Sequence, residues 1–397
     1  MNGMNGRKRS VRDIDLRGKR VFLRVDYNVP TDSSGAISDD SRITESIPTI
    51  RYLLEQECSI VAACHFGRPM GKIVEGLRVG LVRQRLGELV GQDISDLGGP
   101  SGTEALEAAR SLNPGAIGLL ENLRFDPREE ANDPTFARDL GSMGEVFVND
   151  AFGAAHRAHA STEGIAHVLP AVAGLLMARE LEMLGRVISS PVPPVVAIVG
   201  GAKVTDKIAI LRNLTARVDS VLIGGGMVAA FAAAKGFEAG RAEVTAKEVE
   251  AADAILSGPG AAIFLPDDVV TGTSFDEGAA ASVRLFDAVD ADSLILDIGP
   301  ASVDAYSEVI ASARTIVWNG PPGVFEWDSF SGGTRGLASA VASNASATTI
   351  VGGGSTADAV RSLGLADEMT HISTGGGASL EFLEGKTLPG VAALDDI

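Results

Sequence analysis

The sequence predicts an α/β fold with two doubly wound, mostly parallel sheets, each in a Rossmann-like domain, joined by a helix and flanking an interdomain cleft. Short apolar runs recur throughout the 397 residues, and each is followed by Gly-rich or polar residues and then by a stretch of helical composition. Most runs are continuously apolar rather than alternating, as in parallel strands that are covered on both faces. The chain also exceeds the usual domain size of about 100–200 residues, which indicates two domains.

The expected strands divide between the two halves of the chain. In the first half we expect strands at 21–26, 59–65, 116–123 and 146–152. In the second half we expect them at 194–200, 220–224, 262–266, 294–298, 315–319 and 348–351. A helical stretch at 173–190 ends in the run SSPVPP, where proline stops a helix. We expect this helix to connect a first domain at 1–172 to a second domain at 191–377.

Composition excludes several classes of protein. The net charge of −18 and the isoelectric point near 4.7 argue against nucleic acid as a partner, because a polyanion normally binds to a large basic face. No stretch approaches the ~20 apolar residues of a membrane-spanning helix, and no signal peptide begins the chain, so we expect a cytoplasmic protein without membrane contact. The cysteines, Cys58 and Cys64, are expected to be free and buried. His156 and His159 resemble half of a metal site but lack partners with zinc spacing.

Basic residues in the first half fall at or just after strand ends. They are His65, Arg68, Arg124 and Arg157, and Arg42 adds a further guanidinium group at the start of a probable helix. Ligands of open α/β sheets bind beyond the carboxyl ends of the strands, and each guanidinium offers a planar fork that fits phosphate or carboxylate. Asp26 and Asn28, after the first strand, are suited to binding a hydroxyl group. The pattern predicts a pocket for a small, highly charged anion, and the alternative is that these arginines are solvated charges paired with acidic residues.

The second half contains two junctions that are suited to a phosphate. In PVVAIVGGAKVTDKI, Gly200 and Gly201 allow close approach of the backbone, and Lys203 and Lys207 supply point charges at the start of a helix. In IVGGGST, residues 352–356 join another strand to a helix and present N–H groups at its positive end. Glu326, in WNGPPGVFE, is suited to accept hydrogen bonds from ribose hydroxyls. The common P-loop pattern GxxxxGK[ST] does not occur in the sequence.

The longer motif blocks follow one another as RVDYNVP, DDSRI, HFGRPMG, LLENLRF, DAFGAAHRAHAS, GGAKVTDKI, IGGGM, LDIGP, WNGPPGVFE and STGGGASLE. In this order they resemble the phosphoglycerate kinase family over essentially the whole chain. The resemblance implies that the first domain binds 1,3-bisphosphoglycerate or 3-phosphoglycerate through Asp26, Tyr27, Asn28, Arg42, His65, Phe66, Gly67, Arg68, Arg124 and Arg157. It implies that the second domain binds ADP or ATP through Gly201, Ala202, Lys203, Lys207, Gly225, Gly323, Glu326, Gly353, Gly354, Ser355 and Thr356. It also implies that residues 378–397 return to the first domain.

The resemblance implies reversible phosphoryl transfer from 1,3-bisphosphoglycerate to ADP, in glycolysis and gluconeogenesis, by a monomer whose domains close about a hinge. Such a transfer needs alignment of the reactants and neutralisation of the moving charge rather than a general base. Arg42, Lys203 and Lys207 are the expected catalytic residues. Mg²⁺ is the expected cofactor, bound mainly through the nucleotide phosphates, and no side chain is predicted to be a dedicated metal ligand.

Four departures from the family pattern lie on the nucleotide side. Ser355 replaces an Asp that helps to hold the metal, Ile295 replaces a Gly beside the adenine site, Ala301 replaces a Lys and Pro322 replaces a Met. They leave two competing hypotheses: a working kinase with altered nucleotide handling, or a catalytically weak binding protein that keeps the acid-substrate pocket. A third hypothesis, another α/β carboxylate or acyl-phosphate kinase, explains the basic pocket but not the ordered motifs.

Overall fold

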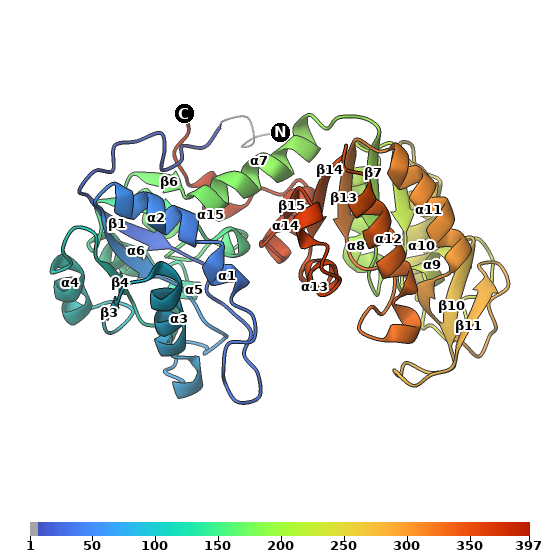
Figure 1. The fold of residues 1–397 in the computed structure, drawn as a ribbon, viewed down its shortest axis with the longest axis horizontal. Coiled ribbons are helices and arrows are strands. Elements are labelled where there is room, and N and C mark those ends of the chain that lie inside the picture. Colours follow the sequence, from blue (N-terminus) through green and yellow to red (C-terminus); the bar gives the residue numbers. More distant parts are fainter. Residues whose placement is uncertain (1–6) are drawn as a thin grey trace. The chain divides into compact units, whose positions relative to one another are not determined.

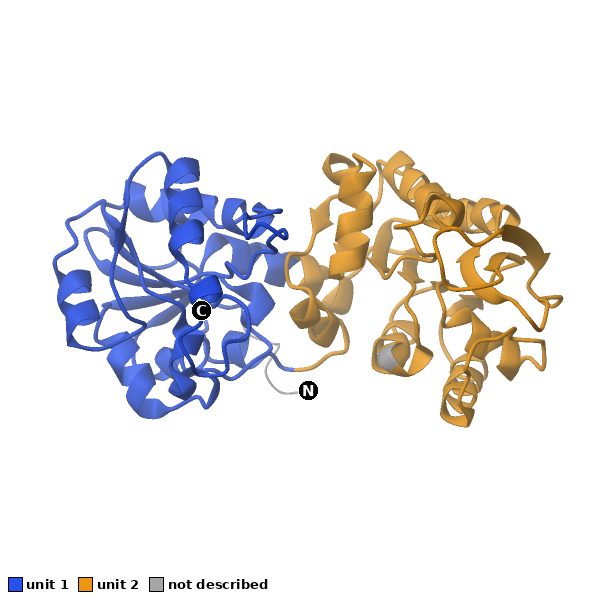
Figure 2. Ribbon diagram, turned by 90° about the horizontal axis from the view of Figure 1, so that it is seen from below, with its two compact units in different colours: residues 1–182, 387–397 blue, residues 183–386 orange. Residues whose placement is uncertain are grey.

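The computed structural model describes residues 7–397, apart from the side chain of Asp206. Its internal contacts divide the chain into two compact units, which Figure 2 shows in different colours. Unit 1 contains the described residues up to Glu182 together with Thr387–Ile397, and unit 2 is Met183–Lys386. The division falls inside helix α7 (Leu175–Ser189), ahead of the SSPVPP run at which the sequence analysis ended the connecting helix.

Unit 1 contains a parallel sheet of six strands in the order β3-β4-β2-β1-β5-β6. The strands are β1 (Arg20–Arg24), β2 (Ser59–Ala63), β3 (Ile94–Asp96), β4 (Ile117–Leu119), β5 (Val146–Asn149) and β6 (Ala171–Ala173). The expected first-half strands are therefore confirmed, although they end earlier than expected. The edge strands β3 and β6 were not predicted, because runs of three residues are too short to show a period.

Helices follow these strands along the chain, as Figure 1 shows. They are α1 (Ser41–Thr44), α2 (Ile47–Glu55), α3 (Gly80–Val90), α4 (Thr103–Arg110), α5 (Pro127–Glu130), α6 (Pro134–Gly141) and, near the end of the chain, α15 (Pro389–Ala392). Val21 and Leu23 of β1 pack into one core cluster with α2 and α3. The residue between them, Phe22, points to the other face of the sheet, where its ring lies 6.4 Å from that of Phe147 in β5. Both faces of β1 are thus buried.

Unit 2 contains a second parallel sheet of six strands, in the order β15-β14-β13-β7-β8-β9. The strands are β7 (Val195–Val199), β8 (Ser220–Ile223), β9 (Ala262–Phe264), β13 (Thr315–Asn319), β14 (Thr348–Gly352) and β15 (His371–Ile372). The helices are α8 (Val204–Thr215), α9 (Val228–Ala234), α10 (Ala246–Leu256), α11 (Pro300–Ser312), α12 (Gly332–Ser343), α13 (Gly354–Ser362) and α14 (Gly377–Leu383).

Alternate residues of β7 enter two separate cores. Val195, Ala197 and Val199 pack with α8, α9 and α10. Val196 and Ile198 pack with α11, α12 and α13. Because successive side chains of a strand point to opposite faces, the two groups of helices cover opposite faces of the sheet. This arrangement confirms the predicted doubly wound fold.

A three-stranded antiparallel sheet in unit 2 was not predicted. The strand expected at 294–298 forms as β12 (Leu294–Ile298), but it pairs antiparallel to β10 (Asp268–Gly272), which also pairs with β11 (Ala281–Leu285). Four of the five residues of β12 are apolar, all but Leu294 are buried, and α12 packs against the strand. Continuous burial indicates coverage on both faces and says nothing about strand direction. The strand expected at 294–298 is therefore confirmed, but it lies outside the parallel sheet of unit 2.

The end of the chain packs on unit 1. Gly390 N donates a hydrogen bond to Ala155 O at 2.9 Å, and Asn149 Nδ2 donates to Gly390 O at 3.1 Å. Lys8 Nζ forms an ion pair with Asp396 Oδ1 at 2.8 Å. The returning segment was expected to begin at 378, but α14 belongs to unit 2, and the segment that belongs to unit 1 begins at Thr387.

Candidate active site

The first group of candidate residues lies beyond the carboxyl ends of β1, β2 and β4. Arg42 Nη1 donates to Asp26 Oδ2 at 2.6 Å. Gly67 N donates to Asn28 Oδ1 at 2.8 Å, and Arg124 Nη1 donates to Gly67 O at 2.8 Å. Gly67 thereby joins the loop after β1 to the turn after β4. Segments that are about one hundred residues apart meet at one edge of the sheet, as the rule for open α/β sheets predicts.

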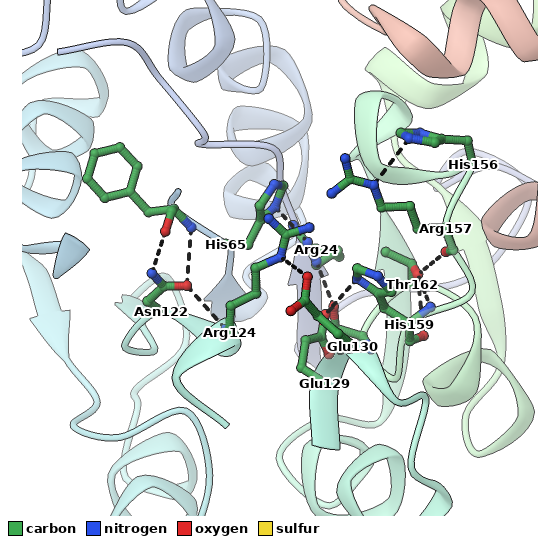
Figure 3. A network of polar contacts seen from close by, with 12 residues as sticks. Arg24, His65, Asn122, Arg124, Glu129, Glu130, His156, Arg157, His159 and Thr162 are labelled. Atoms are coloured by element: carbon green, nitrogen blue, oxygen red, sulfur yellow. Dashed lines mark hydrogen bonds and ion pairs between the residues drawn. The ribbon is translucent and has the colours of Figure 1, made fainter. Parts of the chain in front are cut away.

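His65 is bonded to a buried arginine that the sequence analysis did not name. Arg24, the last residue of β1, is fully buried, and its Nη2 donates to His65 Nδ1 at 3.1 Å (Figure 3). Its Nε donates to Ser161 Oγ at 2.8 Å, and its Nη1 donates to Val25 O. Ser161 donates in turn to the buried carboxylate of Glu129, through Oγ at 2.5 Å and through N at 3.0 Å. These bonds compensate for burying a guanidinium group.

Positive charge is concentrated around His65. Burial lowers the pKa of His65 well below its ordinary value, and neighbouring groups lower it further: Arg24, Arg124, Arg157 and His159. Burial and three arginines likewise lower the pKa of His159 to about 3. At neutral pH both imidazoles are therefore uncharged, and the arginines supply the positive charge that attracts an anion.

Tyr27 and Phe66, two residues of the predicted set, have side chains that are not available to a ligand. Tyr27 is fully buried, its hydroxyl is hydrogen-bonded to Ser46 Oγ at 2.7 Å, and burial raises its pKa. Phe66 is also buried, and its main chain exchanges two hydrogen bonds with the side chain of Asn122, at 3.1 and 2.7 Å. Both side chains belong to the core, so Tyr27 and Phe66 can contact a ligand only through the main chain.

The remaining arginines of the set are more accessible. Arg68 is exposed, Arg157 is half-buried, and Arg157 Nε donates to His156 Nε2 at 3.2 Å (Figure 3). Arg124 is buried and forms an ion pair through Nε with Glu130 Oε1 at 3.2 Å. The structure thus brings Arg124 and Arg157 near His65, as their joint effect on its pKa shows.

The second group of candidate residues lines a cavity of 610 Å³ in unit 2. The predicted residues that line it are Gly201, Ala202, Lys203, Gly225, Gly323, Glu326 and Ser355. Sequence reasoning missed most of the apolar wall, which includes Met227, Val244 and Phe275. It also missed Thr245 and Glu248, although their TxxE spacing forms a capping box at the start of α10 and is legible in the sequence. A mostly apolar cavity with a few polar groups is typical of a nucleotide or other small-molecule site.

Glycine is required where two loops of this cavity meet. A Cβ atom added at Gly200, after β7, would overlap the carbonyl of Pro321, in the loop after β13. Gly225 N donates to Pro322 O at 2.7 Å and joins the loop after β8 to the same segment. Main-chain contacts therefore set the shape of this part of the cavity.

Four predicted nucleotide residues do not line the cavity: Lys207, Gly353, Gly354 and Thr356. Lys207 Nζ donates to Asn319 Oδ1 at 2.5 Å, at the end of β13. Thr356 Oγ1 accepts from Gly320 N at 2.7 Å, and Gly353 precedes α13 with φ of 90°. The contacts of Lys207 and Thr356 hold the ends of β13 and β14 together beside the cavity.

The four departures from the family pattern occupy different places. Ser355 is exposed and lines the cavity, and Ile295 is buried and also lines it. Pro322 contributes its carbonyl to the contact with Gly225 described above. Ala301 does not line the cavity, and its N–H donates to Asp268 Oδ2 at 3.2 Å at the start of α11. Ser355 and Ile295 are therefore the departures that a ligand in this cavity would meet.

A buried carboxylate beneath this cavity was also missed. Asp297, in β12, accepts from Gly333 N at 2.7 Å and from Ile298 N at 2.9 Å. A Cβ atom at Gly323, which lines the cavity, would overlap Asp297 Oδ1. Burial raises the pKa of Asp297 to about 7. Asp297 thus fixes the start of α12 and one wall of the cavity.

The two cysteines have the environment that the sequence predicts. Cys58 and Cys64 are free and buried, as expected, and burial raises their pKa values, to about 11 and about 12. Within residues 7–397, no group of three or more His, Cys, Asp or Glu side chains is arranged to hold a metal ion. None of the described helices has the length and the apolar character needed to span a bilayer.

Comparisons with known proteins agree with this geometry. Residues 11–386 match the family model described as phosphoglycerate kinase. The chain is 49% identical over 392 residues to a phosphoglycerate kinase of Herpetosiphon aurantiacus, covering 98% of this chain and 99% of the relative. It is 50% identical over 394 residues to one of Roseiflexus sp. (strain RS-1), with the same coverage. The solved structure of phosphoglycerate kinase from Coxiella burnetii is 38% identical, with a TM-score of 0.88 over 97% of this chain and 98% of that chain.

Proposed function

The chain belongs to the phosphoglycerate kinase family, and we infer that it transfers a phosphoryl group reversibly from 1,3-bisphosphoglycerate to ADP, a step of glycolysis and gluconeogenesis. It is a phosphotransferase with a carboxyl group as acceptor. The observation that carries the inference is that a cluster of basic side chains in unit 1 and a glycine-rich cavity in unit 2 occur in one chain that matches the family over nearly its whole length.

The acid substrate is assigned to unit 1. Arg68, Arg124 and Arg157 are the groups that bind its phosphate and carboxylate oxygens, because each guanidinium donates in a planar fork. Asp26 and Asn28 bind its hydroxyl, with their carbonyl and carboxylate oxygens already oriented by Arg42 and Gly67. Because these acceptors are already oriented, little free energy is lost in ordering them when the substrate binds.

The nucleotide is assigned to the cavity of unit 2. Its apolar wall accommodates the base, Glu326 is suited to the ribose hydroxyls, and Lys203 lies at the start of α8, where the helix dipole also favours phosphate. Arg42, Lys203 and Lys207 neutralise the charge of the group in transfer. No general base is needed, because the attacking oxygen is anionic in either direction.

The residues of the cavity fit a metal that is held mainly by the nucleotide. Mg²⁺ favours carboxylate and water oxygens, and when bound it neutralises the phosphate charge. Ser355 offers a hydroxyl instead of a carboxylate, and among the lining residues Glu326 is an exposed carboxylate. We propose that the phosphates and water supply most of the ligands of the metal.

We further propose that the units close about a hinge when both substrates are bound. Direct transfer requires the reacting atoms to approach within about 3–3.5 Å, whereas the two assigned sites lie on different units. Small-angle scattering should show a smaller radius of gyration with 3-phosphoglycerate and MgATP together than with either alone. A constant radius with both ligands bound would rule out this closure. The proposal includes a monomer in the cytoplasm, where buried free cysteines such as Cys58 and Cys64 remain reduced.

The test of function is a coupled assay that measures ATP formation from 1,3-bisphosphoglycerate and ADP in the presence of Mg²⁺. A working kinase gives a rate that saturates in both substrates. A protein that binds 3-phosphoglycerate but forms no ATP at saturating nucleotide would be the weak binding protein instead. Repeating the assay with GDP measures how far Ile295 alters the choice of base.

A further inference from the structure

A chain of four hydrogen-bonded side chains leads from the interior of unit 1 to the acid-substrate pocket. Glu129 and Ser161 are fully buried, and Ser161 Oγ lies 2.5 Å from Glu129 Oε1. Ser161 Oγ lies 2.8 Å from Arg24 Nε, and Arg24 Nη2 lies 3.1 Å from His65 Nδ1. Figure 3 shows Arg24 and His65 together with Glu129 at the centre of the surrounding network. Each link is a side chain contacting the next, so the geometry of His65 depends on residues that no ligand touches.

The donor and acceptor groups of these four side chains determine the direction of each hydrogen bond between them. A guanidinium group has only donors, so Arg24 must donate both to Ser161 Oγ and to His65 Nδ1. His65 Nδ1 is therefore an acceptor and carries no proton. The hydrogen of a neutral imidazole then lies on Nε2, and the hydroxyl hydrogen of Ser161 is free to point at Glu129.

The surroundings of His65 oppose its protonation. The charged and titratable groups that act on it are Arg24, Arg124, Arg157 and His159, and each disfavours a second positive charge. Among the described residues, Nε2 of His65 has no hydrogen-bond partner in the protein. Its N–H is thus available to a ligand that binds beside Arg124 and Arg157, whose charges act on His65.

We propose that Glu129 and Ser161 are positioning residues which, through Arg24, hold His65 as a neutral imidazole that donates a hydrogen bond from Nε2 to the acid substrate. The proposal rests on the proposed function for the identity of that substrate. In this arrangement His65 orients the substrate through one hydrogen bond and adds no charge. The arginines supply the positive charge that attracts the substrate. The strength of acid-substrate binding should then not depend on titration of His65 between pH 5.5 and 8.

The tautomer can be observed directly in the full-length protein without substrate. In ¹⁵N-labelled protein, two-bond ¹H–¹⁵N correlation spectra should show His65 Nδ1 as unprotonated and Nε2 as protonated throughout pH 5.5–8, with the assignment made from His65→Gln. A proton on Nδ1, or an imidazolium ion at pH 7, would overturn the proposal. This reading does not depend on activity, so it separates failure of the proposal from failure of the proposed function, which absence of ATP formation would show.

The positioning role is tested by Ser161→Ala, which removes the acceptor of Arg24 Nε. The matched control is Ser302→Ala, because Ser302 is an equally buried serine in unit 2 whose Oγ bonds the main chain and side chain of Asp268. We expect Ser161→Ala to raise the KM for 3-phosphoglycerate by about 2–10-fold, the range that one hydrogen bond is worth. The KM for ATP should stay unchanged, and the His65 nitrogen signals should shift.

The control variant should lose stability to a similar extent, but its His65 signals and its KM for 3-phosphoglycerate should match the wild type. If Ser161→Ala lowers the melting temperature while leaving both readouts like those of Ser302→Ala, the network is only structural and the proposal fails. Glu129→Gln gives a second reading if Ser161→Ala does not fold. It keeps an acceptor for Ser161 but removes the charge, so a smaller change in the same two readouts is expected, and no change would count against the role of Glu129.

Discussion

In unit 1 the candidate site is built from long charged side chains that bond one another, whereas in unit 2 it is built from main chain and small residues. Arg42 is paired with Asp26, Arg124 bonds Gly67, and Arg24 bonds His65. The cavity of unit 2 depends instead on close approaches such as that of Gly200 to Pro321. Under the proposed function, a small anionic acid would be recognised by a fixed set of charges, and a nucleotide by the shape of the cavity together with helix N-termini.

The largest effect is expected from breaking the charge set of unit 1. Arg42→Ala should lower kcat and kcat/KM together by about 10²–10³-fold, the usual cost of losing a donor that stabilises the transition state. Arg51→Ala, which removes an exposed arginine of α2, is the matched control and should leave both parameters unchanged. Steady-state kinetics in the ATP-forming direction measures both. An unchanged kcat in Arg42→Ala would remove this residue from the catalytic set.

The second-largest effect is expected from a substitution that changes the shape of the cavity in unit 2. Gly323→Ala places a Cβ atom against Asp297 Oδ1, so we expect a loss of stability of about 1–3 kcal/mol from overpacking. The KM for ATP should rise while the KM for 3-phosphoglycerate stays constant. Gly185→Ala is the control, because a Cβ atom at that position in α7 meets open space. Equal effects of the two variants on the KM for ATP would show that close packing does not shape the cavity.

The buried carboxylate of Asp297 in unit 2 should make the stability of the protein depend on pH. Asp297 accepts two main-chain N–H groups and has no ion pair within the described part of the chain, and burial raises its pKa to about 7. Between pH ~4 and ~7 the unfolded chain has already lost this proton while the folded protein retains it, so stability should fall as pH rises through this window. The free-energy difference between wild type and Asp297→Asn should therefore shrink, by on the order of 1–4 kcal/mol.

Urea unfolding of both proteins at pH 4.5, 6 and 7.5 measures this difference. If the difference instead grows with pH between 4.5 and 6, Asp297 is ionised in the folded protein. The two N–H donors and the start of α12 would then stabilise the carboxylate more than burial destabilises it.

The smallest effect is expected at Ser355. Ser355→Asp adds a carboxylate to the exposed start of α13, and it should lower the Mg²⁺ concentration for half-maximal rate by a few fold, since Mg²⁺ favours carboxylate oxygen. A magnesium titration at fixed total nucleotide measures the change. Ser362→Asp, at the other end of α13, adds the same charge away from the cavity. If a nearby acid such as Asp358 already supplies the charge, the added Asp brings repulsion, and the requirement for Mg²⁺ stays constant or rises.

Much of the fold was legible in the sequence because continuous apolar runs report burial on both faces. Apolar runs did not predict the direction of a strand or the strand with which it pairs. β10 and β11 form a hairpin that half faces solvent, and nothing local in β12 specifies an antiparallel partner. The pairing depends on distant contacts such as the cap of α11 by Asp268, which accepts from Ser302 N at 2.8 Å.

The sequence predicted the two candidate sites to different degrees. Exposed or half-buried arginines after strand ends pointed to unit 1, but Arg24 was passed over because it lies within an apolar strand. Its burial beside Glu129 cannot be predicted from the local sequence, because Glu129 lies more than one hundred residues away. In unit 2 the glycines indicated where loops approach, whereas Phe275 lines the cavity from the β10–β11 hairpin, which the sequence did not predict.

The central claim is that the acid substrate and the nucleotide bind to different units by different means. Isothermal titration of 3-phosphoglycerate and MgADP, each alone, into Arg68→Ala and Lys203→Ala tests it most directly, because both residues are exposed cations, one in each unit. We predict that Arg68→Ala weakens only 3-phosphoglycerate and that Lys203→Ala weakens only MgADP, each by about 10-fold or more for a lost charged hydrogen bond. Equal weakening of both ligands by either substitution, or loss of nucleotide binding in Arg68→Ala, would contradict the assignment.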